Sequence, residues 1–270
     1  MKYFQVLFIL LISILSCTPT QLPLCDANHQ NLKYPIIAHS HNDYDQSLPI
    51  TNARRHGFTS LEVDIVFDGT DLKVSHDDDN LKDKPLFEEL YLKPIIEEVL
   101  TDSLCIILLV DIKNYSEVLL ESLNQTLEKQ SSDLVSREAP HNNFNKIKVI
   151  LSGDFPRDEI IQDNTNRYLF IDGRMTDFDL NASSDLTPLI SMDFSELSGW
   201  NGKYNPNAET LETISQTIDL VHSHGKMIRF WNTADREPIW LNLIELGADV
   251  IGVDDIDKFC AVMKKNGLLE

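Results

Sequence analysis

The sequence is poor in cysteine and in positive charge, and each shortage excludes a class of protein. Four cysteines are scattered through 270 residues without the regular spacing of a disulfide framework. Lysine and arginine together number 23, against 43 aspartates and glutamates, which gives a net charge of −20. This balance argues against nucleic-acid binding through a basic surface. It also means that any anionic substrate needs a local positive centre.

The sequence also lacks an apolar run long enough for a membrane span, which needs about 18 or more residues. Its N-terminal run, Phe4 to Leu15, instead suits the core of a secretory signal. The segment Ile14-Leu15-Ser16-Cys17 resembles a bacterial lipobox, so we expect residues 1–16 to be a lipoprotein signal peptide and Cys17 to carry lipid. An ordinary signal peptide cut elsewhere is the alternative. The expected location is the cell envelope, lipid-anchored to a bacterial membrane.

Two further segments follow. Residues 17–33 are polar, contain Pro19 and Pro23 and show no hydrophobic periodicity, so they are predicted to be a tether. Residues 34–270 have the length of one large domain, without an internal repeat. Cys105 opens an apolar strand and Cys260 lies in a helical tail, and we expect both to be buried, unpaired thiols.

Within that domain, strand-like apolar runs alternate with helical patterns. Alternation of this kind indicates a parallel sheet, and eight such units predict a single closed (β/α)8 TIM barrel, with a doubly wound open sheet as the alternative. The predicted strands are 34–38, 61–66, 105–110, 147–151, 169–171, 189–192, 227–230 and 250–253, with a short return strand at 72–74.

Acidic residues interrupt two of the apolar strands. Strand side chains alternate with a period of two, so Glu62 and Asp64 share a face, which must be the barrel interior because Leu61 and Val63 take the other side. The same count predicts that Asp111 lies on an inward face of its strand. Functional residues of such barrels lie at the carboxyl ends of the strands.

Three buried carboxylates from neighbouring strands can hardly all stay ionised without a counter-ion. Glu62, Asp64 and Asp111 are therefore predicted to bind a hard divalent cation, Mg²⁺ or Ca²⁺. Neutral imidazoles beside such a site can act as general base and general acid. His39 and His76 are predicted to be this catalytic pair, with the two roles unassigned between them, while His41 orients the substrate or His39.

Ala38-His39, Glu62-Val63-Asp64 and His76-Asp77 together resemble the motifs of glycerophosphodiester phosphodiesterases, whose barrel is shared with bacterial phosphatidylinositol phospholipase C. The resemblance implies a phosphoric diester hydrolase that acts on a glycerophosphodiester, a phospholipid head group or another small-molecule or lipid phosphodiester. It also implies that Asp111 is the third metal ligand, that Lys113 binds the phosphate and that Trp231 lines the site.

One branch of this superfamily is closer still. The opening "HSHNDY", Ser152-Gly153 and "DGR" at Asp172–Arg174 resemble the branch named after altered inheritance of mitochondria protein 6. Asp172 thereby joins His41, Lys113 and Trp231 as an expected substrate-binding residue. The superfamily usually has His-Arg-Gly at the first motif, whereas Ser40 and His41 follow His39 here. A guanidinium near the substrate phosphate is therefore absent or replaced.

Two other function classes fit parts of the pattern. His39-Ser40-His41 also matches the start of a zinc hydrolase of the amidohydrolase type, but zinc would need further histidine or lysine ligands from later strands, whose predicted ends carry no histidine. The second is a non-catalytic surface lipoprotein that binds a phosphorylated head group or a glycan. Nothing in the sequence specifies an oligomeric state.

Overall fold

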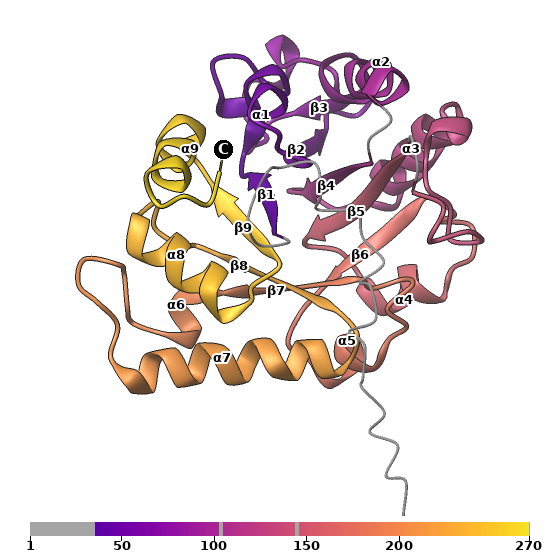
Figure 1. Cartoon of the computed structure of the whole chain (residues 1–270). Coiled ribbons are helices and arrows are strands. Elements are labelled where there is room, and N and C mark those ends of the chain that lie inside the picture. The colour runs from indigo at the N-terminus through magenta and orange to yellow at the C-terminus, as the bar shows by residue number, and fades with distance from the viewer. Residues whose placement is uncertain (1–35, 103–104, 144–145, 270) are drawn as a thin grey trace, which may run out of the picture.

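The computed structural model describes residues 36–102, 105–143 and 146–269, and its strands form a ring with helices around it (Figure 1). Neighbouring strands in the ring pair in parallel, and the pairing of β1 with both β2 and β9 closes it. The predicted TIM barrel is therefore confirmed. Its eight strands are β1 (Ile37–Ser40), β2 (Ser60–Phe67), β4 (Ile106–Ile112), β5 (Ile147–Gly153), β6 (Leu169–Gly173), β7 (Leu189–Asp193), β8 (Met227–Trp231) and β9 (Val250–Val253).

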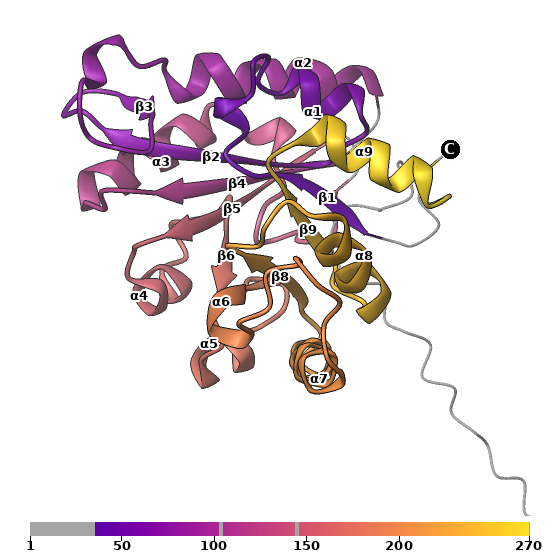
Figure 2. The ribbon, with the colours of Figure 1, turned by 90° about the vertical axis from the view of Figure 1, so that its left-hand side faces the viewer.

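Helices connect these strands along the outside of the ring, and the carboxyl ends of β2, β4 and β5 point to the same side (Figure 2). Ser116 is the N-cap of one helix, since its Oγ accepts a hydrogen bond from the Leu119 backbone N–H at 3.1 Å. The helices are α1 (Thr51–Arg55), α2 (Lys93–Asp102), α3 (Glu117–Glu128), α4 (Arg157–Gln162), α5 (Asp177–Asn181), α6 (Phe194–Leu197), α7 (Ala208–Ser223), α8 (Glu237–Leu246) and α9 (Ile256–Lys265).

A ninth strand, β3 (Leu72–Val74), folds back on β2 as an antiparallel hairpin. The turn is closed by Asp68, whose Oδ1 accepts hydrogen bonds from the backbone N–H groups of Thr70 and Asp71. The chain after β3 returns to the barrel rim, where the Ser75 N–H donates to the Asp64 carbonyl at 3.2 Å. This hairpin therefore brings His76 back to the end of β2.

The inward faces of the strands change from apolar to polar along the barrel. The lower interior is a cluster of buried apolar side chains that includes Ile37, Leu109, Phe170, Met227 and Val250. One inward position further along each strand, two residues on, the side chains are polar. This second layer contains His39, Asp111, Asp172, Arg229 and the small Gly252. The barrel is thus filled with hydrocarbon at its base and carries its ionisable groups toward the carboxyl ends of the strands.

One cysteine prediction holds and one is wrong. Cys260 is a buried free thiol, and burial raises its pKa to about 11. Cys105 is disulfide-bonded, so the expectation of an unpaired thiol there is corrected. The apolar residues of this strand gave no indication that Cys105 forms a disulfide. The predicted signal peptide, the tether and Cys17 lie outside the described residues. Within the described part of the chain, every helix is too short or too polar to cross a bilayer.

Candidate active site

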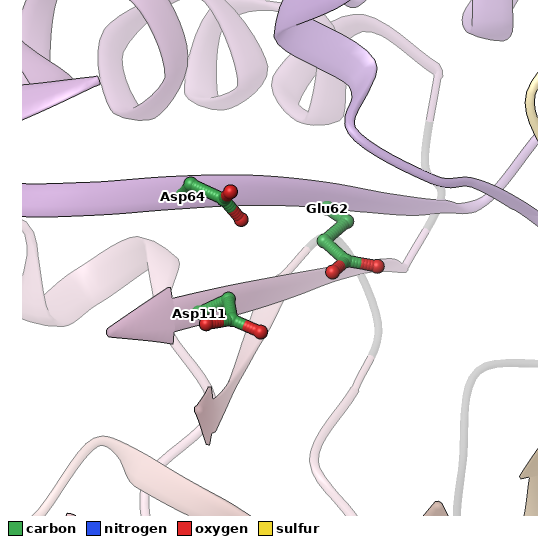
Figure 3. A group of neighbouring side chains, drawn as sticks. All are labelled: Glu62, Asp64 and Asp111. Carbon is green, nitrogen blue, oxygen red and sulfur yellow. The ribbon is translucent and has the colours of Figure 1, made fainter. Parts of the chain in front are cut away.

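Three carboxylates from two adjacent strands lie close together (Figure 3). Glu62 and Asp64 project from β2, and Asp111 projects from β4 directly beside Asp64 in the strand register. One oxygen of each lies within 4.8 Å of the others, and both β2 carboxylates are buried. The sequence prediction that these three side chains meet is therefore matched by the geometry.

The two carboxylate oxygens of Asp64 differ in their hydrogen-bond partners. Its Oδ2 accepts hydrogen bonds from Tyr44 Oη at 2.7 Å and His76 Nδ1 at 2.8 Å, and Lys113 Nζ lies 3.0 Å away. Its Oδ1 is buried without a hydrogen-bond partner among the described residues. An unpartnered buried carboxylate oxygen is costly. Oδ1 is therefore available as a ligand, and its neighbours Glu62 and Asp111 offer the further oxygen donors that a hard cation prefers.

Asp111 lies at the more open edge of this cluster. Burial, together with the negative charges of Asp64 and Glu62 and against the opposing effect of Lys113, raises the pKa of its carboxyl to about 6. Lys113 Nζ lies 3.2 Å from Asp111 Oδ1. The protonated form of Asp111 is therefore stabilised by crowding of like charges, which a bound cation would relieve.

Glu62 is held from two sides by groups deeper in the barrel. Arg229 Nη1 donates to Glu62 Oε2 at 2.7 Å, and His39 Nε2 lies 2.8 Å from the same oxygen. Burial alone raises the pKa of the Glu62 carboxyl. The guanidinium of Arg229 and the hydrogen bond from His39 outweigh burial and hold this pKa well below its usual range. Glu62 is therefore a permanent anion, with a second carboxylate oxygen left for a ligand.

His39 is enclosed on both ring nitrogens. Its Nδ1 lies 2.8 Å from Ser60 Oγ, and its Nε2 lies 2.8 Å from both Glu62 and Arg229 Nη1. Burial lowers the pKa of His39 to about 4. A neutral His39 ring that is protonated at Nε2 donates to Glu62 and accepts at Nδ1 from Ser60. Arg229 also donates to Glu62, so each of these groups has a hydrogen-bond partner.

The remaining residues of "HSHNDY" build the loop after β1. Ser40 points outward and donates to Asp43 Oδ1 at 2.7 Å, while Asp43 Oδ2 accepts from the Ile50 N–H at 2.7 Å and Tyr91 Oη at 2.9 Å. Ile50 has a φ of 62°, an uncommon conformation for a β-branched residue. Buried Asp43 thus fixes the loop that delivers Tyr44 to Asp64.

His41 lies on the other side of the β1 end. Its Nδ1 is 2.6 Å from Asp254 Oδ1 at the end of β9. Both side chains line a cavity of about 160 Å³ together with Trp231, which is 40% exposed at the end of β8. The predicted substrate-binding residues His41 and Trp231 therefore share one cavity, and His39 and Arg229 form part of its wall.

Asp172 belongs to a separate polar group across the barrel. Its Oδ2 accepts from Ser152 Oγ at 2.7 Å and from Arg174 Nη1 at 2.9 Å, and Arg229 Nη2 lies 4.0 Å away. Its Oδ1 is buried without a hydrogen-bond partner in the described structure. The "SG" and "DGR" segments therefore meet in space, with Asp172 tying them to Arg229.

Sequence reasoning missed two side chains that complete the site, Arg229 and Tyr44, and it placed Asp254 at a predicted strand end without giving it a role. Arg229 brings a guanidinium to the site from β8. A signal for it existed, because an arginine inside an apolar strand, two residues before Trp231, must share the inward face of that residue. The contact of Tyr44 with Asp64 depends on the loop after β1, and no periodicity predicts such a loop.

Comparison of the fold with solved structures supports the barrel assignment. A glycerophosphodiester phosphodiesterase from Parabacteroides distasonis superposes with a TM-score of 0.58 at 14% identity, covering 87% of this chain and 99% of that one. A phosphodiesterase from Oleispira antarctica, solved with the product sn-glycerol-3-phosphate, gives 0.54 at 12% identity, covering 86% and 97%. The tryptophan synthase alpha-subunit from Pyrococcus furiosus gives 0.53 at 11% identity, covering 91% and 99%, so this likeness shows the fold alone.

Comparison of the sequence corrects the expected location. Altered inheritance of mitochondria protein 6 of Eremothecium gossypii is 25% identical over 268 residues, which cover 83% of this chain and 69% of that protein. Its homolog in Arthroderma benhamiae is 22% identical, with 83% and 82% covered. These relatives are proteins of fungi, which are eukaryotes. The prediction of a lipid-anchored protein of a bacterial envelope is therefore wrong, because a lipobox-like tetrapeptide is too short to specify an address.

The same comparison bears on the motifs of the first two strands. Residues 29–104 match the family described as AIM6-like phosphodiesterase domain. This segment contains His39, His41, Glu62, Asp64 and His76. The match supports phosphodiester hydrolysis as the general class of chemistry. The resemblance read from these motifs is confirmed: the chain is similar in sequence to altered inheritance of mitochondria protein 6, and its fold is similar to that of glycerophosphodiester phosphodiesterases.

Proposed function

We propose that this chain is a metal-dependent phosphoric diester hydrolase that uses Mg²⁺ or Ca²⁺ held by Glu62, Asp64 and Asp111. The observation that carries the proposal is the unpartnered, buried Oδ1 of Asp64 within a cluster of three carboxylates. All the donors are carboxylate oxygens, the set that hard cations prefer, and the cluster contains no histidine or cysteine that would favour zinc. The zinc-hydrolase alternative is therefore disfavoured.

The side chains around the cluster suit attack at phosphorus. A bound cation would neutralise the charge that develops on the phosphoryl oxygens. Lys113 lies beside it and adds a mobile positive charge, and Arg229 adds a fixed one behind Glu62. His76 donates through Nδ1 to Asp64 and is 60% exposed, so its Nε2 is open to a substrate proton. A histidine at the carboxyl end of β1, His39 or His41, is the second acid/base group.

The substrate class follows from the relatives and from the charges. The matched family is a phosphodiesterase domain, and the Oleispira enzyme was solved with a glycerol phosphate product. On a protein of net charge −20, the cation site with Lys113 is the positive centre that a phosphate anion requires. We infer a phosphodiester with a hydroxylated head group, such as a glycerophosphodiester or an inositol phosphodiester. A hydroxyl neighbouring the phosphate can then serve as the first nucleophile, which gains the advantage of proximity.

The direct test is an assay of purified protein on a panel of glycerophospho-, inositolphospho- and simple dialkyl diesters, with Mg²⁺, Ca²⁺ or excess chelator. We expect hydrolysis that requires the cation and is faster when a hydroxyl neighbours the phosphate. Asp64→Asn should lose most of this activity, because it removes a charge from the clustered site while keeping its shape. Asp185→Asn removes an equal charge from the surface preceding β7 and should be unaffected.

Each contrary result has a distinct meaning. Full activity in excess chelator contradicts the metal dependence. Binding of the diesters by wild-type protein without any product, in every metal, contradicts the hydrolase assignment and favours the non-catalytic binder. Equal rates for diesters with and without the neighbouring hydroxyl exclude internal attack and leave water as the nucleophile.

A further inference from the structure

His39 within β1 and His41 directly after it differ in what their ring nitrogens can do. His39 has both nitrogens occupied, is 1% exposed and contacts Glu62, Arg229 and Ser60. His41 has its Nδ1 occupied by Asp254, while its Nε2 has no hydrogen-bond partner in the part of the chain that the structure describes. Its side chain is 38% exposed and lines the cavity beside Trp231. A substrate therefore has access to a nitrogen of His41 and not to one of His39.

The backbone that carries Asp254 is itself held in place. Asp235 Oδ2 accepts hydrogen bonds from the backbone N–H groups of Asp254 at 3.0 Å and Asp255 at 2.6 Å, and Gln46 Nε2 donates to the Asp254 carbonyl at 2.8 Å. The His41 backbone N–H donates to Val253 at 3.1 Å, which ties the ends of β1 and β9 together. The imidazole and its carboxylate are thus fixed by separate strands, and Nε2 is the atom left to react.

We propose that His41, oriented by Asp254, is the general acid that protonates the leaving oxygen of the phosphodiester. The proposal rests on the proposed function and deepens it. His39 then serves as a positioning residue that holds Glu62. The cavity beside His41 receives the leaving alcohol, and at about 30 Å³ per water its volume equals roughly five waters, enough for a small alcohol.

The proton balance of this step closes. The attacking hydroxyl gives its proton to His76 Nε2 as its oxygen bonds to phosphorus. The bond from phosphorus to the leaving oxygen breaks with its electron pair, and that oxygen takes the proton from His41 Nε2. When water later opens a cyclic product, the two histidines exchange roles and both return to their first state.

The charges around His41 favour the form that an acid needs. Burial alone lowers the pKa of His41, but the hydrogen bond to Asp254 and the negative charges of Glu62 and Asp254 raise it above 6.5, against an opposing effect of Arg229. The surroundings of His41 therefore favour its imidazolium form. His39, with a pKa lowered to about 4, is neutral under the same conditions.

The test compares two diesters that share the phosphoryl part hydrolysed fastest in the panel. One has a methoxide leaving group, which must be protonated, and the other has a p-nitrophenolate leaving group, which leaves unaided. His41→Ala should lower kcat/KM for the methyl diester by about 10²–10⁴-fold and should change the nitrophenyl diester far less. Asp254→Asn should show the same contrast at smaller size through kcat, with KM unchanged.

Two variants serve as references. His39→Ala should slow both diesters equally, because it disturbs Glu62 rather than the leaving group. His222→Ala removes a histidine with the same type of carboxylate partner, Asp249, at 2.8 Å and at the opposite end of the strands, and should leave both rates unchanged. Melting temperatures of all variants establish that they are folded.

The assignment of His41 would be overturned if His41→Ala lost activity on both diesters in equal measure, or on neither. A leaving-group contrast that appears in His39→Ala instead would also overturn it. Wild-type protein that hydrolyses neither diester with Mg²⁺ or Ca²⁺ would overturn the hydrolase function itself, and the role of His41 with it.

Discussion

Arg229 is the residue whose surroundings depend most on the barrel. It is 5% exposed, donates to Glu62 and lies near Asp172, so one guanidinium compensates carboxylates from β2 and β6. A buried cation of this kind is tolerated only because its partners are anions. The same contacts stabilise the carboxylates of Glu62 and Asp172 in the barrel interior. Their charges, with that of Arg229, form the electrostatic surroundings in which a substrate and a cation bind.

His222 and Asp249 give a residue-scale test that is independent of the active site. The hydrogen bond to Asp249, at 2.8 Å, raises the pKa of His222 above 6.5, and burial opposes it. Because the folded-state pKa exceeds the unfolded one, the stability from this pair is fully present below pH 6.5 and is lost as pH rises through the folded pKa.

We therefore expect His222→Gln to reduce the free energy of unfolding more at pH values below 6.5 than at pH values above the folded pKa. Urea unfolding at the two extremes measures the difference. In an Asp249→Asn background the effect of His222→Gln should no longer vary with pH. An effect in the wild-type background that is flat with pH, or larger in alkali, would contradict the assignment.

At the scale of elements, Gly153 links the end of β5 to the carboxylate cluster. Its φ is +89°, and a Cβ added there would clash with the Ile112 carbonyl and lie 2.5 Å from Asp111 Oδ1. The strand end can pass Asp111 only because it carries no side chain. This close approach explains why the Ser152-Gly153 segment has a glycine at its second position.

Gly153→Ala should therefore cost about 1–3 kcal/mol of stability through backbone strain and also weaken cation binding by displacing Asp111. Gly247→Ala is a matched control, since Gly247 has a φ of +94° with nothing within 4 Å of an added Cβ. It should show a smaller loss of stability, from backbone strain alone, with cation affinity unchanged. Titration calorimetry and urea unfolding separate the two effects, and equal cation affinity in both variants would count against the clash with Asp111.

The sequence predicts the strands well because each is a continuous apolar run, buried on both faces. It misses α4, α5 and α6, which have only four to six residues and are too short to show helical periodicity. The carboxylate cluster was predictable because acidic residues inside apolar strands are rare and costly. The cavity beside His41 was not predictable, because it depends on where Asp235, Gln46 and Trp231 lie at the ends of separate elements.

At the scale of the whole molecule, the net charge of −20 makes cation binding a matter of stability as well as of chemistry. A ligand that binds only the folded state stabilises it by about 2.7 kcal/mol at 100 times its Kd. We expect Mg²⁺ or Ca²⁺ to raise the melting temperature by a site-specific amount that saturates with concentration.

Differential scanning fluorimetry with the divalent chloride, compared with NaCl at equal ionic strength, measures this shift. Asp64→Asn should abolish the saturating part and keep only the general response to salt. If the variant and the wild type respond identically, the stabilisation arises from diffuse screening of negative charge, and the carboxylate cluster is not a cation site.

In a closed ring of parallel strands, residues that are far apart in the sequence can place the same chemical group at one position in the barrel. The first motif has Ser40 beside His39, and β8, nearly the whole length of the domain away, supplies a guanidinium 2.8 Å from that histidine. A motif search that demands a fixed neighbour would discard such a protein, whereas a search that demands a charge at a given height on any strand would keep it. Families built on this scaffold are therefore better compared layer by layer around the ring than letter by letter along the chain.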